Sequence, residues 1–282
     1  MQVRMFSTTS TLLKSITPHK ATGVFYTDKE RLALTLPADL FQVLFGCLLG
    51  DLCAYKKPNG STQLKFEQSI VHSTYLLHLF SLLFDYCGAF PRIMERFDKR
   101  YQRHSYSLWF YTLSLPCFDS LYSLFYMNGS KQIPANIANY ITPISLTFWL
   151  ADDGGKHGKG LMLNTNSYEQ VQVELLSLVL NQAFGFSSTV YAKKGKTSTY
   201  YTIYIPPKDM PKLRALVLPY LHSSMHFKLL SKNSPWLKVL GCYIGVKIVS
   251  ATSGLHMGNH YGEHRLYAGR LLEPQIPSVT QG

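Results

Sequence analysis

Two mostly apolar segments of this chain each lead into an aspartate, and these two residues, Asp51 and Asp153, lie 102 positions apart. The first segment, 44–51, reads LFGCLLGD, and the second, 146–154, reads LTFWLADDG. A carboxylate at the end of a buried helix is costly unless a positive partner compensates its charge. A divalent cation is the usual partner where two such carboxylates meet. We therefore expect Asp51 and Asp153 to come together at one charged site.

The elements around the two aspartates follow one another in the same order, which indicates an internal repeat. Three further landmark pairs have similar spacing: 97 positions for Gly88 and Gly185, 91 for Pro116 and Pro207, and 97 for Lys131 and Lys228. Hydrophobic periodicity predicts, in the first half, strands at 62–69 and 105–115 with helices at 75–86 and 118–126, and in the second half, strands at 160–165 and 200–205 with helices at 171–184 and 212–221. The sequence thus predicts an α+β fold of two pseudo-symmetric αββαββα repeats.

Pseudo-twofold symmetry would place the two aspartate-bearing helices face to face at the axis. Close helix packing needs small side chains on the shared face. We expect Gly46 and Gly50 to supply this face in the first helix, and Thr147 and Ala151 in the second.

These residues resemble the LAGLIDADG homing endonucleases, in particular the single-chain branch that carries two motifs. Leu44, Gly46 and Asp51 match the first motif, and the second motif is matched by Leu146, Asp153 and Gly154. The resemblance runs from about residue 36 to 230. Leu52 and Phe148 stand where the founding motif has glycine, but both lie outside the carboxylate position.

The resemblance implies a metal-dependent DNA endonuclease. Asp51 and Asp153 would coordinate Mg²⁺, with the backbone carbonyls of Gly50 and Asp152 completing the site. Lys131 and Lys228 would lie near the scissile phosphates and stabilise charge or order the attacking water.

The resemblance also implies two curved antiparallel sheets that form a saddle in the DNA major groove. Strands in that groove can present side chains to base edges. The DNA-contacting candidates on or near these strands are Gln63, Lys65, Glu67, Ser69, Tyr101, Arg103, Ser105, Ser107, Asn164, Asn166, Lys193, Lys194, Lys196, Thr199 and Tyr201. We expect 192–198 to be a loop whose lysines contact phosphates. Unequal halves would read a long, asymmetric target.

Composition agrees with a polyanionic partner. The chain has 282 residues and a net charge of +12, and the basic excess is present in both halves. Five cysteines without a CxxC pair argue against a zinc ribbon and against a disulfide framework. No apolar stretch approaches the length of a membrane-spanning helix, so we expect no membrane contact.

We divide the chain into an N-terminal segment (1–36), a first repeat (37–140), a second repeat (141–232) and a C-terminal extension (233–282). Residues 1–27 are basic, rich in Ser and Thr, and free of acids, which is typical of a mitochondrial transit peptide. An ordinary N-terminal tail is the alternative. His256, His260 and His264 recur every four residues, but the interleaved glycines favour a flexible polar tail over a metal-binding helix.

Three functions remain open from the sequence. The first is a site-specific DNA endonuclease that acts as a monomer, because one chain carries both motifs. The second is a maturase that binds intron RNA on the same fold, since a basic surface suits either nucleic acid. The third is a noncatalytic mitochondrial nucleic-acid-binding protein.

Overall fold

The computed structural model describes residues 26–58, 60–195 and 198–230. These residues belong to the first of two compact units, Met1–Lys232. Nearly all of the expected transit peptide, the C-terminal extension with its three histidines, and Lys196 lie outside the described residues. Within the described ranges, no helix has the length and apolar character needed to cross a membrane.

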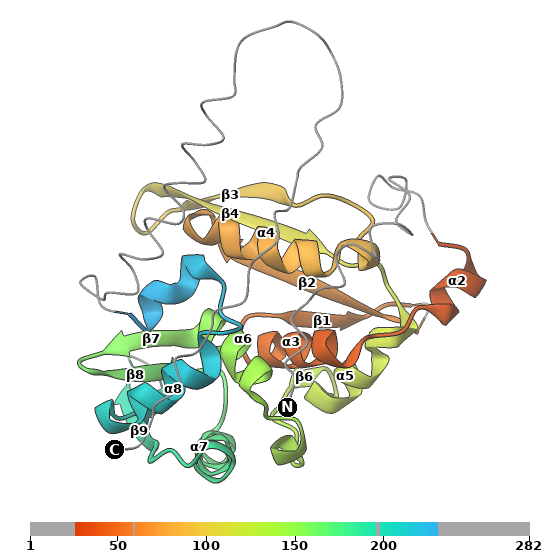
Figure 1. Cartoon of the computed structure of the whole chain (residues 1–282). Helices are drawn as coiled ribbons and strands as arrows, with labels where there is room; N and C mark the ends of the chain where they lie inside the picture. The colour runs from red at the N-terminus through yellow and green to blue at the C-terminus, as the bar shows by residue number, and fades with distance from the viewer. Residues whose placement is uncertain (1–25, 59, 196–197, 231–282) are drawn as a thin grey trace, which may run out of the picture. The chain divides into compact units, whose positions relative to one another are not determined.

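Two consecutive αββαββα repeats form the fold (Figure 1), so the predicted α+β architecture is confirmed. The first repeat consists of α3 (Ala38–Leu49), β1 (Cys53–Lys56), β2 (Thr62–Ser69), α4 (Ser73–Leu82), β3 (Arg92–Asp98), β4 (Arg103–Tyr111) and α5 (Asp119–Phe125). The second consists of α6 (Pro143–Asp153), β7 (Gly154–His157), β8 (Gly160–Asn164), α7 (Gln170–Phe184), β9 (Thr189–Lys194), β10 (Thr199–Ile205) and α8 (Met210–Val217). Outside this pattern lie α2 (Asp28–Ala33) and a short hairpin of β5 (Tyr126–Met127) and β6 (Ser130–Lys131).

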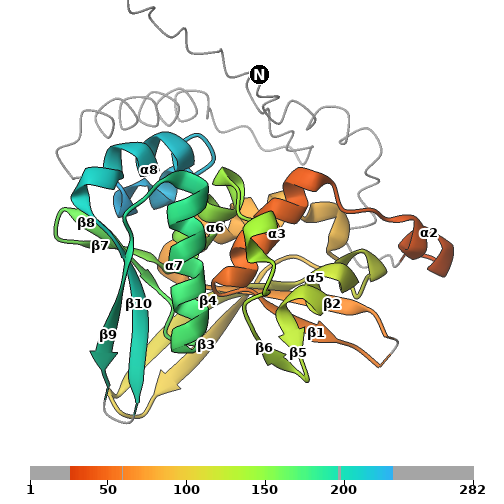
Figure 2. The same cartoon turned by 90° about the horizontal axis from the view of Figure 1, so that it is seen from below.

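Each repeat contains one open, four-stranded antiparallel sheet. The strand orders are β1-β2-β4-β3 and β7-β8-β10-β9, which are equivalent under the repeat. Figure 1 shows the two sheets on either side of the central pair α3 and α6. Figure 2 shows the hairpins β3–β4 and β9–β10 extending away from α3, α6 and α8. The sheets therefore lie where they can flank a ligand that meets the ends of the central helices.

The central helices are buried because most of their positions are apolar. Eight of the twelve residues of α3 are buried, including every residue of 43–49. A helix that is hydrophobic all round must be enclosed by other elements. At the start of α6, Thr142 accepts a hydrogen bond from the Ser145 backbone and Pro143 occupies the first turn, so this helix begins at a defined residue.

Four strands of the two sheets were not predicted individually, and neither was the hairpin β5–β6. β1 and β7 are short and follow the central helices directly, and β3 and β9 have mostly exposed side chains and no apolar alternation. The expectation of a loop over 192–198 is wrong at its start, because β9 continues to Lys194 and pairs with β10. Helix α4 is also shorter than predicted: it ends at Leu82, and a 3-10 turn covers Phe84–Tyr86.

Candidate active site

The two central helices approach each other through the glycines of α3. A Cβ atom added to Gly46 would lie 2.2 Å from the Ser145 carbonyl oxygen of α6. A Cβ atom added to Gly50 would lie 2.6 Å from the Cβ of Asp152. The expected glycine face is therefore present on α3. The α6 atoms nearest to these added Cβ atoms belong to Ser145, Phe148 and Asp152, not to the expected Thr147 and Ala151, and the Thr147 hydroxyl reaches the Val217 carbonyl of α8.

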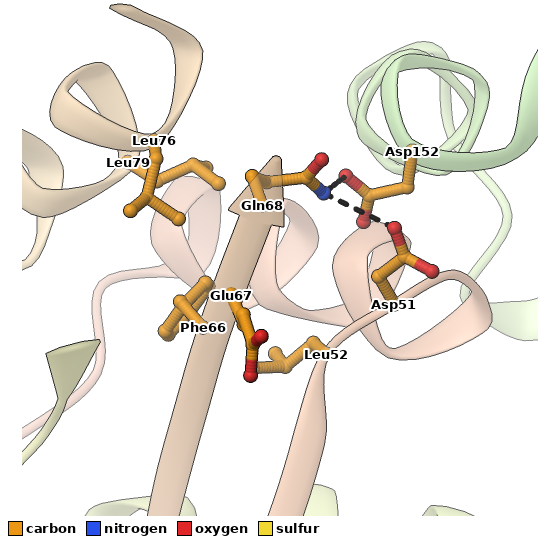
Figure 3. A pocket seen from close by; sticks show the side chains of 8 residues that line it. All are labelled: Asp51, Leu52, Phe66, Glu67, Gln68, Leu76, Leu79 and Asp152. Carbon is orange, nitrogen blue, oxygen red and sulfur yellow. Dashed lines mark hydrogen bonds between the residues drawn. The ribbon is translucent and has the colours of Figure 1, made fainter. Parts of the chain in front are cut away.

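This packing gathers carboxylates from both repeats at one place. Asp51 follows α3, while Asp152 and Asp153 end α6. Figure 3 shows Gln68 of β2 between two of them: its Nε2 atom donates to Asp51 Oδ2 at 3.1 Å and to Asp152 Oδ1 at 3.3 Å. One amide group thus connects acids that belong to different repeats.

The negative charge of Asp51 is close enough to raise the pKa values of both aspartates of α6. Burial raises the pKa of Asp153 to about 7, and the negative charge of Asp51 adds to the rise. Burial, followed by the charges of Asp51 and Asp153, raises the pKa of Asp152 well above its ordinary value. A site that holds this much negative charge is suited to a cation.

A lysine from each repeat donates to the backbone beside these acids. Lys131 of β6 bonds through Nζ to the carbonyl oxygens of Gly50 at 2.7 Å and Leu52 at 3.0 Å. Lys228, in the 3-10 helix Ser223–Lys228, bonds to the carbonyls of Ala151 and Asp152, the latter at 3.0 Å. Burial lowers the pKa of both lysines, and the neighbouring acids oppose that shift. The repeat-related lysines thus occupy equivalent positions.

The donor set suits a divalent cation that takes its remaining ligands from water and from a substrate. In the described part of the chain, no group of three or more His, Cys, Asp or Glu side chains is arranged to hold a metal by itself. Mg²⁺ commonly takes one or two carboxylates and fills its remaining positions with water and phosphate oxygens. Asp51 and Asp153 supply two carboxylates, so the residues present suit such an ion once a phosphate-bearing substrate completes the shell.

On the first sheet, four side chains beside Asp51 form one network. Glu67 of β2 accepts from Lys65 at 2.9 Å, from Ser107 of β4 at 2.9 Å, and from Arg96 of β3. The hydrogen bond from Arg96 is the largest of the causes that lower the pKa of Glu67 to about 2. The network opens onto a hollow that is also lined by Asp51 and Gln68. It therefore presents cationic groups next to the carboxylates.

The other candidates for DNA contact have different surroundings. The Gln63 amide donates to the Thr112 carbonyl at 2.8 Å, and the exposed Arg103 guanidinium lies 5.3 Å from the ring centroid of Tyr101. Asn164 donates to the Asp153 carbonyl at 3.0 Å, which places it at the carboxylate site. Lys193 and Lys194 are exposed near the end of β9, opposite Tyr200 and Thr199 of β10.

Three residues of the site were missed by sequence reasoning. Gln68 and Arg96 were not singled out, and Asp152 was considered only for its carbonyl. Gln68 carried a weak signal, because it continues the face of β2 that follows the buried Leu64 and Phe66 in alternation. No sequence signal pointed to the contact between Asp152 and Gln68, because the two residues belong to different repeats.

Comparison with known proteins agrees with this geometry. The sequence model described as the LAGLIDADG DNA endonuclease family matches residues 41–213. The cytochrome b mRNA maturase bI2 of Saccharomyces cerevisiae is 35% identical over 69% of this chain, but the match spans only 48% of that relative. The protein of the same name from Debaryomyces hansenii is 32% identical over 69% of this chain and 74% of its own length.

Two further comparisons concern endonucleases. The probable intron-encoded endonuclease 1 of Wickerhamomyces canadensis is 33% identical over 67% of this chain and 83% of its own. Among solved structures, the homing endonuclease I-WcaI bound to its DNA recognition sequence superposes with a TM-score of 0.66 at 29% identity. That match covers 77% of this chain and 96% of the other.

Proposed function

This chain belongs to the LAGLIDADG DNA endonuclease family, and we propose that it is a site-specific endonuclease that cleaves both strands of one long, asymmetric DNA target. The observation that carries the proposal is the convergence of Asp51 and Asp153 at the ends of two packed helices. Each of the two is accompanied by a repeat-related lysine, Lys131 or Lys228, that donates to the neighbouring backbone. Both halves of this site come from one chain, so the enzyme acts as a monomer.

The two aspartates would hold a divalent metal, for which we propose Mg²⁺, with the carbonyls of Gly50 and Asp152 beside them. Such an ion would supply Lewis acidity that lowers the pKa of a water molecule and neutralises charge on the displaced oxygen. Lys131 and Lys228 keep positive charge at the edge of the site, where each can stabilise negative charge on a scissile phosphate. Asn164 fixes the backbone of Asp153 through its 3.0 Å hydrogen bond.

The two sheets bind the DNA on either side of the cleavage centre. Glu67 and Arg96 line the hollow beside Asp51, Lys65 pairs with Glu67, and these three side chains face the central base pairs. Gln63 and Arg103 extend the contact surface of the first sheet, and Lys193 and Lys194 add phosphate contacts on the second. The different side chains on equivalent strands favour an asymmetric target.

Selection from a randomised duplex library tests this function. The full chain is incubated with the library and Mg²⁺, and in parallel with Ca²⁺, which often supports binding without turnover. We expect cut ends at one long sequence with Mg²⁺ only, and none with the matched Asp51→Asn, Asp153→Asn double variant. A folded wild-type protein that binds the library but cuts no sequence in it would reject the endonuclease.

A second candidate function is RNA splicing, supported by the two relatives named cytochrome b mRNA maturases. If the chain is a maturase, the Asp51→Asn, Asp153→Asn variant should still restore splicing of its intron RNA. The same names support a mitochondrial location for this chain. Imaging of the full-length chain beside a mitochondrial marker tests that location, and a purely nuclear or cytosolic signal would reject it.

A further inference from the structure

The two carboxylates proposed to bind metal are not held in the same way. Gln68 Nε2 donates to the side chain of Asp51 at 3.1 Å. The repeat-equivalent position, 97 residues later, is Thr165, whose hydroxyl donates instead to the Tyr201 carbonyl at 2.7 Å. Strand pairing supports this equivalence. Two residues after its aspartate, Cys53 pairs with Lys65 and Gly155 pairs with Met162. Gln68 and Thr165 each lie three residues beyond that partner.

The second partner of Gln68 comes from the other repeat. Asp152 Oδ1 accepts from the same nitrogen at 3.3 Å, so both hydrogens of the amide are engaged, one by each acid (Figure 3). The acceptors also fix the orientation of the amide, because turning it over would direct its oxygen at two carboxyl groups. Asp152 thus limits where Gln68, and through it Asp51, can lie.

A glycine makes room for this arrangement. The position that corresponds to Asp152 in the first repeat is Gly50, and a Cβ atom on Gly50 would lie 2.6 Å from Asp152 Cβ and 2.9 Å from its Oδ2. The Asp152 side chain therefore crosses the α3–α6 interface over Gly50 and reaches the site of the first repeat. No side chain can cross in the opposite direction, because Gly50 has none.

We propose that the Asp152 side chain is a positioning residue that acts through Gln68 on Asp51, so that the two DNA strands are cut by unequally organised halves of the site. This inference rests on the proposed endonuclease function. Asp152 contributes its carboxyl group only to the half that contains Asp51. Loss of that group should therefore slow one strand more than the other.

Strand-resolved cleavage tests the proposal. A duplex target carrying a different fluorophore on each strand is cut under single-turnover conditions, and the two nicking rates are measured separately. We expect Asp152→Ala to slow one strand by about ten-fold more than the other, since a 1 Å misplacement of a reacting group can cost about 100-fold and Asp51 should move by less. Gln68→Ala should slow the same strand, and Asp152→Asn, which keeps an acceptor oxygen, should lie closer to wild type.

Thr165→Val is the matched control, because it alters the equivalent position of the second repeat. We expect it to leave the ratio of the two nicking rates unchanged. Equal slowing of both strands by Asp152→Ala, or slowing of opposite strands by Asp152→Ala and Gln68→Ala, would overturn the proposal.

A measurement without metal or DNA separates this inference from the proposed function. Urea denaturation in EDTA is followed for wild type, Asp152→Ala, Gln68→Ala and the double variant. We expect the midpoint shift of the double variant to differ from the sum of the single shifts, because residues in contact do not act additively. Additive shifts would reject the contact. If the wild-type protein cut no DNA at all, the proposed endonuclease function would be rejected. The denaturation experiment would still test the contact between Asp152 and Gln68.

Discussion

Gly46 of α3 lies so close to Ser145 of α6 that a Cβ atom on the glycine would come within 2.2 Å of the serine carbonyl oxygen. We predict that Gly46→Ala forces the two helices apart and lowers the free energy of unfolding by about 1–3 kcal/mol, the usual cost of overpacking. Urea denaturation measures the change. Gly155→Ala is the control, because a Cβ atom there meets nothing within 4 Å. Equal effects of the two substitutions would contradict a packing limit at Gly46.

Asp51 and Asp153 should both be required for cutting. We predict that Asp51→Asn and Asp153→Asn each lower the cleavage rate by at least about 100-fold, because metal-ion catalysis contributes several kcal/mol. Removal of one negative charge should leave DNA binding intact or slightly tighter. Single-turnover cleavage in Mg²⁺ and binding in Ca²⁺ separate the two effects. Normal cutting by Asp153→Asn would show that the proposed metal site is wrong.

The network around Glu67 should set sequence preference near the cleavage centre. Arg96 is held by Glu67, and an arginine fixed in the major groove commonly pairs with guanine. We predict that Arg96→Ala reduces discrimination at one base pair by about 1–3 kcal/mol, and that Glu67→Gln has a smaller effect at the same position. Sequencing of cleaved library targets measures both.

Lys193→Ala is the matched control for the Arg96 experiment, because Lys193 is exposed and lies away from that network. It should weaken binding to all targets about equally and reduce the dependence of affinity on salt. If Lys193→Ala changed the preference at a single base pair and Arg96→Ala did not, the assignment of Arg96 to base recognition and of Lys193 to phosphate contact would be wrong.

A half-buried histidine should make the fold sensitive to acid. The ring of His78 on α4 stacks on His222 at 4.7 Å and on Phe148 of α6 at 6.5 Å. Burial, and to a lesser degree His222, lowers the pKa of His78 to about 4. The unfolded chain binds this proton near pH 6.5, so between pH 6.5 and about 4 the unfolded state carries more protons. The contribution of His78 to stability should therefore fall as the pH decreases through this window, whereas the raised pKa of Asp153 acts in the opposite direction.

We predict that His78→Phe, which can keep the ring stacking, removes part of this acid sensitivity. Urea denaturation at pH 7 and pH 4.5 measures the difference for each protein. His157→Phe is the control, because His157 is exposed on β7. If His78→Phe and wild type lose the same stability on acidification, the histidine stack is not the cause. His222 lies in the same stack, and burial, followed by the charge of His226, lowers its pKa as well.

The sequence predicted the repeat and its central helices well, because these features depend on local patterns. Thr62–Ser69 was predicted as a strand with the bounds that the structure shows, since Leu64 and Phe66 alternate with polar residues. The strand β3 was missed because both of its faces are largely exposed, so no apolar alternation marks it. Strand β7 begins with two glycines, which have low strand propensity, and only its pairing with β8 defines it.

Site residues could be predicted where both repeats carry the same residue at equivalent positions. They could not be predicted where the repeats differ. The common spacing singled out Lys131 and Lys228 together, and the structure places both against backbone carbonyls next to the acids. Gln68 and Asp152 have no such match, because Thr165 and Gly50 stand at their equivalent positions. Their contact depends on how closely α3 approaches α6, which a local pattern cannot report.

The close fit between Gly50 and Asp152 constrains how the two halves could have diverged after a duplication. Identical copies would carry the same residue at both positions, and any side chain at the first would collide with an aspartate at the second. The glycine therefore had to be in place before the acid could be accepted in the other copy. Any residue with a side chain at position 50 would now crowd Asp152, so the two positions can change freely only together.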